Sequence, residues 1–150
     1  MMGTFLSFYF YFFLKAKIQT SAFAEFTESF LQYLIKAELG LLEARLEYEN
    51  TLKRIGTFDI VLLSMGEDGH IASLFPNHVY LEEQMVVVEQ DSPKPPKERV
   101  SMSYQQLNKA HYIFKLIIGE SKQKAVTLLE QNVNLPITKV NGECEKLFFL

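Results

Sequence analysis

A short segment with two glycines, two acids and a histidine is the first candidate for chemistry in this chain. It has the sequence Gly66-Glu67-Asp68-Gly69-His70. Glycines allow a sharp turn and a close approach of the backbone to a ligand. Because Asp68 and His70 are two residues apart, the carboxylate can orient the imidazole in a tight turn, and such a histidine is a natural general base near neutral pH. A plain turn with a surface histidine is the alternative interpretation.

A second candidate segment, Gly119-Glu120-Ser121-Lys122, places a lysine in the first turn of a predicted helix that Ser121 is expected to cap. Backbone N–H groups and the positive end of the helix dipole favour an anion there, and Lys122 adds a full charge. A solvated lysine on a polar face is the alternative. Together, the two segments favour a site for a phosphorylated small molecule.

The sequence patterns of nucleotide-binding, serine-hydrolase and zinc sites are absent from the chain. The chain has no GxGxxG or GxxxxGK[ST] segment. Ser73 is not in a GxSxG segment, so a serine-hydrolase triad has no support. His70, His78 and His111 follow no zinc spacing, and Cys144 is the only cysteine. We therefore expect neither a metal nor a cofactor.

Both segments follow predicted strands. The run Phe58–Met65 (FDIVLLSM) is almost continuously apolar, which is typical of a strand buried on both faces, and Tyr112–Ile118 (YIFKLII) is the next strong candidate. Ligands of open α/β sheets bind beyond the carboxyl ends of parallel strands. The two segments are expected in such positions.

The other predicted elements alternate between helix and strand. We expect a helix from Thr20 or Ser21 to Gly40, a helix over 41–54, strands over 85–89, 99–103 and 146–150, a short helix over 104–110, and a helix after Ser121 with Ala125, Leu128 and Leu129 on its buried face. The three prolines of Asp91–Lys97 predict an extended loop. This order predicts one α/β domain with an open, mainly parallel sheet flanked by helices.

The helix over 41–54 has the clearest pattern. Its apolar residues recur on one face, at Leu41, Ala44, Tyr48 and Leu52. On the other face, Glu49 and Lys53 have the spacing of a favourable ion pair.

Composition and charge narrow the function further. The 150 residues are 48% hydrophobic, which suits a globular domain, and the formal net charge is -3. This charge gives no general attraction for nucleic acid or anionic membranes, so we expect neither as a partner. An anionic ligand must be held by a few placed cations. The single cysteine excludes an intrachain disulfide and favours a reducing compartment, so we expect a cytoplasmic protein.

The start of the chain is unusual. Phe5–Leu14 is rich in aromatic residues, and Ala22-Phe23-Ala24 resembles the cleavage site of a secretory signal. Against a signal, no positive charge precedes the run, and its ten residues are well below the roughly 18 of a membrane span. We favour a buried strand or a terminus foreign to the ancestral domain, with a signal as the alternative.

The first segment extends into Met65–Pro76 (MGEDGHIASLFP), which closely resembles the signature of 6-phosphogluconolactonases. The agreement continues in order through DSPKPP at 91–96, Arg99-Val100, LNKA at 107–110, GESK at 119–122, Leu135-Pro136 and LFF at 147–149. It covers about residues 41–150. The resemblance implies a partial lactonase-like domain over 41–150, a divergent aromatic-rich segment over 1–40, and a Rossmann-like sheet of the kind found in glucosamine-6-phosphate deaminases.

The resemblance also implies an activity. Members hydrolyse 6-phospho-D-glucono-1,5-lactone to 6-phosphogluconate in the pentose phosphate pathway, without metal or nucleotide. By resemblance, His70 would activate the attacking water, and Asp68 would shape the site with the loop backbone at Gly66 and Gly69.

The same resemblance assigns the substrate-binding cations. Lys122 and Arg99 would bind the phosphate or carboxylate end of the phosphorylated sugar lactone. The deaminase branch shares Gly-His-Ile-Ala, but it is expected to have a glutamate where this chain has Phe75. An apolar ring cannot do acid–base work, so we favour the lactonase.

The chain departs from the family pattern in two respects. Ser64 stands where a glycine is usual. We find neither a Gly-Gly-Ser phosphate loop nor an Asp-Glu-Arg segment in residues 1–57, nor a helix after the last strand. We therefore expect a member shortened at both ends, with a non-catalytic, partner-bound remnant as the alternative to an enzyme.

Overall fold

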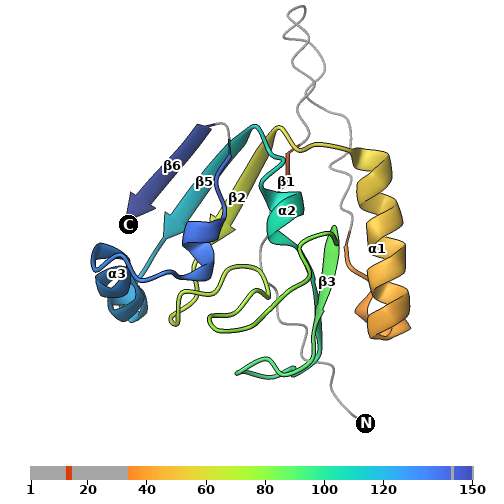
Figure 1. Cartoon of the computed structure of the whole chain (residues 1–150), viewed down its shortest axis with the longest axis horizontal. Coiled ribbons are helices and arrows are strands. Elements are labelled where there is room, and N and C mark those ends of the chain that lie inside the picture. The colour runs from red at the N-terminus through yellow and green to blue at the C-terminus, as the bar shows by residue number, and fades with distance from the viewer. Residues whose placement is uncertain (1–12, 15–33, 143, 150) are drawn as a thin grey trace, which may run out of the picture.

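The central sheet determines where the candidate site lies. A computed structural model describes residues 13–14, 34–142 and 144–149. Within this part the strand order is β1-β2-β5-β6, and the strands are β1 (Phe13–Leu14), β2 (Ile60–Ser64), β5 (Tyr112–Ile117) and β6 (Cys144–Phe149). Strands β2, β5 and β6 are parallel, and β1 pairs antiparallel with β2 (Figure 1). The predicted α/β class, with a mainly parallel open sheet flanked by helices, is confirmed.

The strands predicted at 85–89 and 99–103 exist but do not join this sheet. They form a separate antiparallel pair, β3 (Val86–Glu89) and β4 (Arg99–Met102). The short proline-rich connection between them explains the arrangement, because antiparallel strands need only a loop whereas parallel neighbours need a crossover of a dozen or more residues.

The predicted helix over 41–54 is α1 (Leu41–Ile55), which packs against β3 and β4. Ala44, Tyr48 and Leu52 are buried on one face, as expected. The predicted Glu49–Lys53 ion pair is present on the other face, with 2.9 Å between Lys53 Nζ and Glu49 Oε1.

The predicted helix that ends at Gly40 lies mostly outside the described residues. Its described end is a single 3-10 turn, η1 (Ala37–Leu39), rather than an α-helix. The aromatic run Phe5–Leu14 also lies outside them except for the two residues of β1. Within the described ranges, we find no helix with the length and apolar character needed to cross a bilayer.

The second half of the domain contains α2 (Tyr104–Leu107), α3 (Gln123–Glu130) and the 3-10 turns η2 (Glu120–Lys122) and η3 (Pro136–Lys139). Helix α2 is shorter than the predicted 104–110. The prediction that Ser121 caps a helix is wrong, because Ser121 lies within η2 and neither η2 nor α3 has a side-chain cap. Gly119, with φ of 97°, makes the turn instead.

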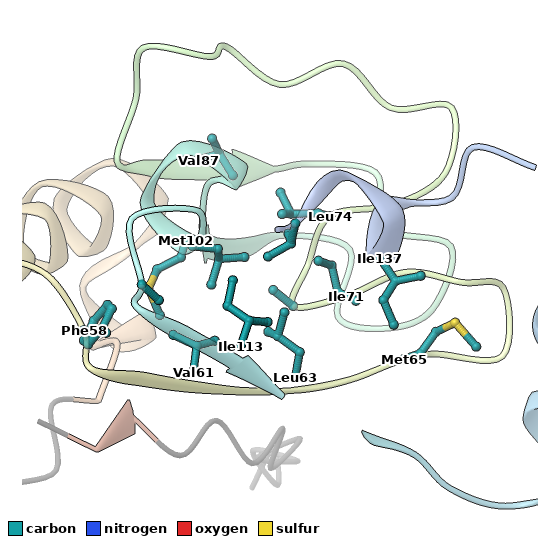
Figure 2. Close-up of a cluster of buried hydrophobic side chains, with 14 of the residues drawn as sticks. Phe58, Val61, Leu63, Met65, Ile71, Leu74, Val87, Met102, Ile113 and Ile137 are labelled. Atoms are coloured by element: carbon teal, nitrogen blue, oxygen red, sulfur yellow. The ribbon is translucent and has the colours of Figure 1, made fainter. Parts of the chain in front are cut away.

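The core lies between the sheet and the elements that cover one of its faces. Val61 and Leu63 of β2 and Ile113 of β5 point toward residues from the β3–β4 pair, the loop after β2 and η3 (Figure 2). On the opposite face of β2, Ile60 and Leu62 are only half-buried. The expectation of a strand buried on both faces therefore holds for one face, since the covering elements contribute their apolar side chains to the Val61 side.

Candidate active site

The two segments singled out from the sequence lie at one edge of the sheet. Gly66 follows β2 by one residue, and Gly119 follows β5 in the same way. Because β2 and β5 are parallel neighbours with Ser64 opposite Leu116, their carboxyl ends lie side by side. In Figure 1, the loop after β2 and helix α3 lie beyond the tips of these arrows. This is the position expected for a ligand site in an open α/β sheet.

The loop after β2 is closed by backbone hydrogen bonds. Gly66 N–H donates to the His70 carbonyl at 2.7 Å, and Gly69 N–H donates to the Gly66 carbonyl at 3.1 Å. Gly69 has φ of 87°, a region that glycine enters without strain. The chain therefore leaves the strand and returns within a few residues, with Glu67 and Asp68 at the tip.

Both glycines of this loop are placed where a side chain would collide. A Cβ at Gly66 would lie 2.1 Å from Nδ1 and Cε1 of His70, and one at Gly69 would lie 2.7 Å from Leu135 Cδ1. The close approach expected at Gly66 is therefore made by the catalytic candidate itself, whose ring lies over the glycine.

Asp68 and His70 form the predicted pair. Asp68 Oδ1 is 2.5 Å from His70 Nδ1 and accepts the His70 backbone N–H at 3.2 Å. Partial burial raises the pKa of Asp68, but hydrogen bonds from the His70 ring and backbone and the charge of His70 outweigh it, so the pKa lies below its ordinary value. The anionic carboxylate orients the ring and leaves Nε2 as the nitrogen turned away from Asp68.

Phe75 supports the other side of the imidazole. The two ring centroids are 4.7 Å apart, and Phe75 is almost completely buried. The ring is therefore held between Gly66, Asp68 and Phe75, which restricts its rotamers in the way a positioned base requires.

Arg99, a predicted substrate-binding residue, packs near Phe75 and donates hydrogen bonds to backbone carbonyls of its own loop. Its guanidinium carbon is 5.4 Å from the Phe75 centroid, and its Nη2 donates to the Lys94 carbonyl at 2.7 Å. Its Nε donates to the Pro96 carbonyl at 3.0 Å. These contacts organise the loop between β3 and β4. The contact of Arg99 with substrate stays a prediction.

Lys122 lies half-buried in η2, beyond the end of β5. Its charge reaches the first loop, because it helps to lower the pKa of Glu67 after the larger effects of the Lys94 hydrogen bond and charge. Lys94 Nζ is 2.8 Å from Glu67 Oε2. Lys94 belongs to the predicted proline-rich loop, but it was not among the site residues predicted from the sequence.

A second cluster missed from the sequence surrounds Glu89, a buried residue at the end of β3. Glu89 Oε2 accepts the Tyr80 hydroxyl at 2.6 Å and is 2.7 Å from His78 Nδ1. Tyr80 in turn accepts the Phe75 backbone N–H at 3.0 Å. The cluster therefore fixes the backbone of the residue that packs against His70. A charged residue at the end of the apolar run 85–89 was the available signal.

The described ranges contain no group of three or more His, Cys, Asp or Glu side chains that could hold a metal ion. That the site needs neither metal nor cofactor stays a prediction.

Comparisons with known proteins identify the family to which the chain is similar. The family model described as glucosamine-6-phosphate isomerases/6-phosphogluconolactonase matches residues 13–149. The chain is 35% identical over 136 residues to 6-phosphogluconolactonase 3, chloroplastic, of Arabidopsis thaliana, covering 79% of this chain and 42% of that protein.

Solved structures of 6-phosphogluconolactonases are also similar to this chain. The 6-phosphogluconolactonase of Thermotoga maritima superposes with a TM-score of 0.67 at 28% identity, covering 77% of this chain and 53% of that one. The enzyme of Leishmania guyanensis gives 0.59 at 29% identity, covering 73% and 51%. The chain therefore spans about half the length of these relatives, or less.

Proposed function

Because the chain belongs to the glucosamine-6-phosphate isomerase/6-phosphogluconolactonase family, we propose that its site hydrolyses 6-phospho-D-glucono-1,5-lactone to 6-phosphogluconate, a step of the pentose phosphate pathway. The observation that carries the proposal is the Asp68–His70 pair at the carboxyl end of β2, with 2.5 Å between Asp68 Oδ1 and His70 Nδ1. The names of the relatives provide the substrate, and the pair provides a chemistry for it.

In the proposed reaction, His70 Nε2 takes a proton from a water molecule as its oxygen attacks the lactone carbonyl carbon. The carboxylate of Asp68 stabilises the imidazolium that forms, since it already holds Nδ1. When the tetrahedral intermediate collapses, the bond between the carbonyl carbon and the ring oxygen breaks. The proton on His70 then passes to this ring oxygen, which becomes the hydroxyl of the open acid.

Phe75 supports a lactonase rather than a deaminase. The family description covers both branches. In the deaminase branch a glutamate is expected at this position, whereas Phe75 has no ionisable group, is 2% exposed and packs on the His70 ring. The position therefore serves to hold the base, and no carboxylate from it reaches the substrate.

The remaining assignments follow the sequence analysis. Lys122 and Arg99 are proposed to bind the anionic end of the substrate, and Gly66 and Gly69 to shape the loop. All of these residues fall within 41–150, the proposed partial lactonase-like domain. The single cysteine of the chain supports a reducing compartment, and we propose the cytoplasm.

Hydrolysis of freshly generated lactone by the purified chain tests the proposal, with the spontaneous rate subtracted. We expect a rate above background that His70→Ala abolishes. The matched control is His111→Ala, because His111 is exposed and precedes β5, at the opposite end of the sheet from the site. No rate above background from folded parental protein would contradict the proposal and favour a non-catalytic member of the family.

A further inference from the structure

Glu67 of the site loop is paired with a lysine from a distant segment. Lys94 Nζ lies 2.8 Å from Glu67 Oε2, although 27 residues separate them in the chain. Both side chains are more than half exposed, at 63% for Lys94 and 52% for Glu67. Glu67 directly precedes Asp68, so this pair marks the rim of the site beside the proposed base.

The backbone of Lys94 is held firmly although its side chain is exposed. Its carbonyl accepts hydrogen bonds from the Ser92 hydroxyl at 2.8 Å and from Arg99 Nη2 at 2.7 Å. Ser92 and Arg99 are both buried. A cation on an anchored loop loses less freedom on binding an anion than one on a mobile loop, so this is a favourable place for a binding group.

A second cation acts on the same carboxylate. The hydrogen bond and charge of Lys94 lower the pKa of Glu67 most, and the charge of Lys122 lowers it further. Lys122 lies in η2, which follows the neighbouring strand β5. Two lysines from separate loops thus both favour the ionised form of the Glu67 carboxyl.

We propose that Lys94 is a further substrate-binding residue, that Lys94 and Lys122 together hold the phosphate group of the substrate, and that the Glu67 carboxylate occupies this position until substrate displaces it. The inference rests on the phosphorylated substrate of the proposed function. A phosphate dianion carries more charge than a carboxylate and has more acceptor oxygens. The displaced pair is exposed, and such pairs contribute little to stability.

Lys97 provides a matched control. It lies on the same loop and carries the same charge, but its Nζ pairs with Asp91 Oδ1 at 2.9 Å and its side chain is similarly exposed. Any effect of overall charge should appear in Lys97→Ala as strongly as in Lys94→Ala. If Lys94 contacts the phosphate group directly, binding should weaken only in Lys94→Ala.

The test is calorimetric titration of the full chain and its variants with 6-phosphogluconate and with gluconate, at low ionic strength. We expect Lys94→Ala to weaken 6-phosphogluconate binding by about tenfold, as loss of a charge-assisted hydrogen bond predicts. Lys97→Ala should change it less than about twofold, and Glu67→Gln should tighten it. Gluconate, which lacks the phosphate, should respond to none of the three.

Equal losses in Lys94→Ala and Lys97→Ala would overturn the inference, as would weaker binding in Glu67→Gln or no measurable binding of 6-phosphogluconate. None of these readouts requires turnover. If the binding pattern holds but no lactone is hydrolysed, the inference stands and the proposed reaction fails. If lactone is hydrolysed and Lys94→Ala keeps the parental KM, the reaction stands and the inference fails.

Discussion

The imidazole of His70 occupies the space that a side chain at Gly66 would need. A Cβ at Gly66 would lie 2.1 Å from both Nδ1 and Cε1 of the ring. The ring can meet Asp68 at 2.5 Å only because this position carries no side chain. The absence of a side chain at Gly66 is therefore as necessary for the position of the His70 ring as the Asp68 carboxylate that orients it.

Gly66→Ala should reduce activity without unfolding the protein. The methyl group must push the His70 ring away from Asp68, while the exchange leaves the rest of the loop unchanged. We expect kcat for lactone hydrolysis to fall by about a hundredfold, the scale of a misplaced catalytic group. The far-UV circular dichroism spectrum should stay parental. A folded variant with parental kcat would show that the ring position does not matter.

Asp68→Asn should reduce activity through His70. The amide cannot stabilise an imidazolium and can hold the ring in the wrong tautomer, so we expect kcat to fall about a hundredfold or more. Single-turnover rates measure this directly. Asp91→Asn is the matched control, since the Asp91 side chain is 85% exposed and pairs with Lys97 rather than with the ring, so this variant should keep kcat.

The Asp68–His70 pair should also contribute to stability in a pH-dependent way. The pKa of Asp68 in the folded chain lies below its ordinary value of 3.8. The contribution is therefore present above about pH 4 and is lost as the pH falls through the lowered folded pKa. We expect the difference in Tm between the parental chain and Asp68→Asn to shrink across this acid range. A difference in Tm that stays constant from neutral pH into this acid range would contradict the predicted contribution of the Asp68–His70 pair to stability.

Tyr80→Phe should destabilise the fold through the Glu89 cluster. The change removes the hydroxyl that donates to Glu89 at 2.6 Å and accepts the Phe75 N–H at 3.0 Å. Loss of a partner for buried polar groups costs about 1–3 kcal/mol. Urea unfolding measures the change. Tyr112→Phe is the matched control, because Tyr112 is 49% exposed, and should stay within about 0.5 kcal/mol of the parental value.

Gln106→Leu should stabilise the fold. Gln106 is 1% exposed, and neither atom of its side-chain amide has a hydrogen-bond partner in the described part of the chain. A leucine of similar size removes this desolvation cost, and we expect a gain of about 1–2 kcal/mol. The backbone N–H of Gln106, which bonds the Ser103 hydroxyl, is unaffected.

The control for this change is Gln105→Leu, the same substitution at the exposed neighbouring position. Thermal unfolding of both variants should show a higher Tm for Gln106→Leu alone. Equal shifts would mean that the gain comes from helix propensity or denatured-state effects, not from the buried amide.

The sequence predicted most of the elements and the position of the candidate site. Apolar runs located β2 and β5, and helical spacing located α1 with its Glu49–Lys53 pair. The sequence-based predictions were wrong or incomplete where the structure of a segment depends on which other segments it pairs with or on the turn that precedes it. The run 85–89 forms a strand, but nothing within it indicates that β4 is its only partner in the described sheets. Ser121 resembles a cap, yet Gly119 makes the turn.

The sequence by itself determined that Asp68 and His70 would face one another, because both lie in one tight loop and local geometry decides which atoms can meet over two residues. Only the tertiary structure decided that Lys94 reaches Glu67, 27 residues away in the chain. This contact joins segments whose separation depends on how the β3–β4 pair packs over the sheet. Packing of this kind is set by the whole core, so no local pattern of residue types contains it.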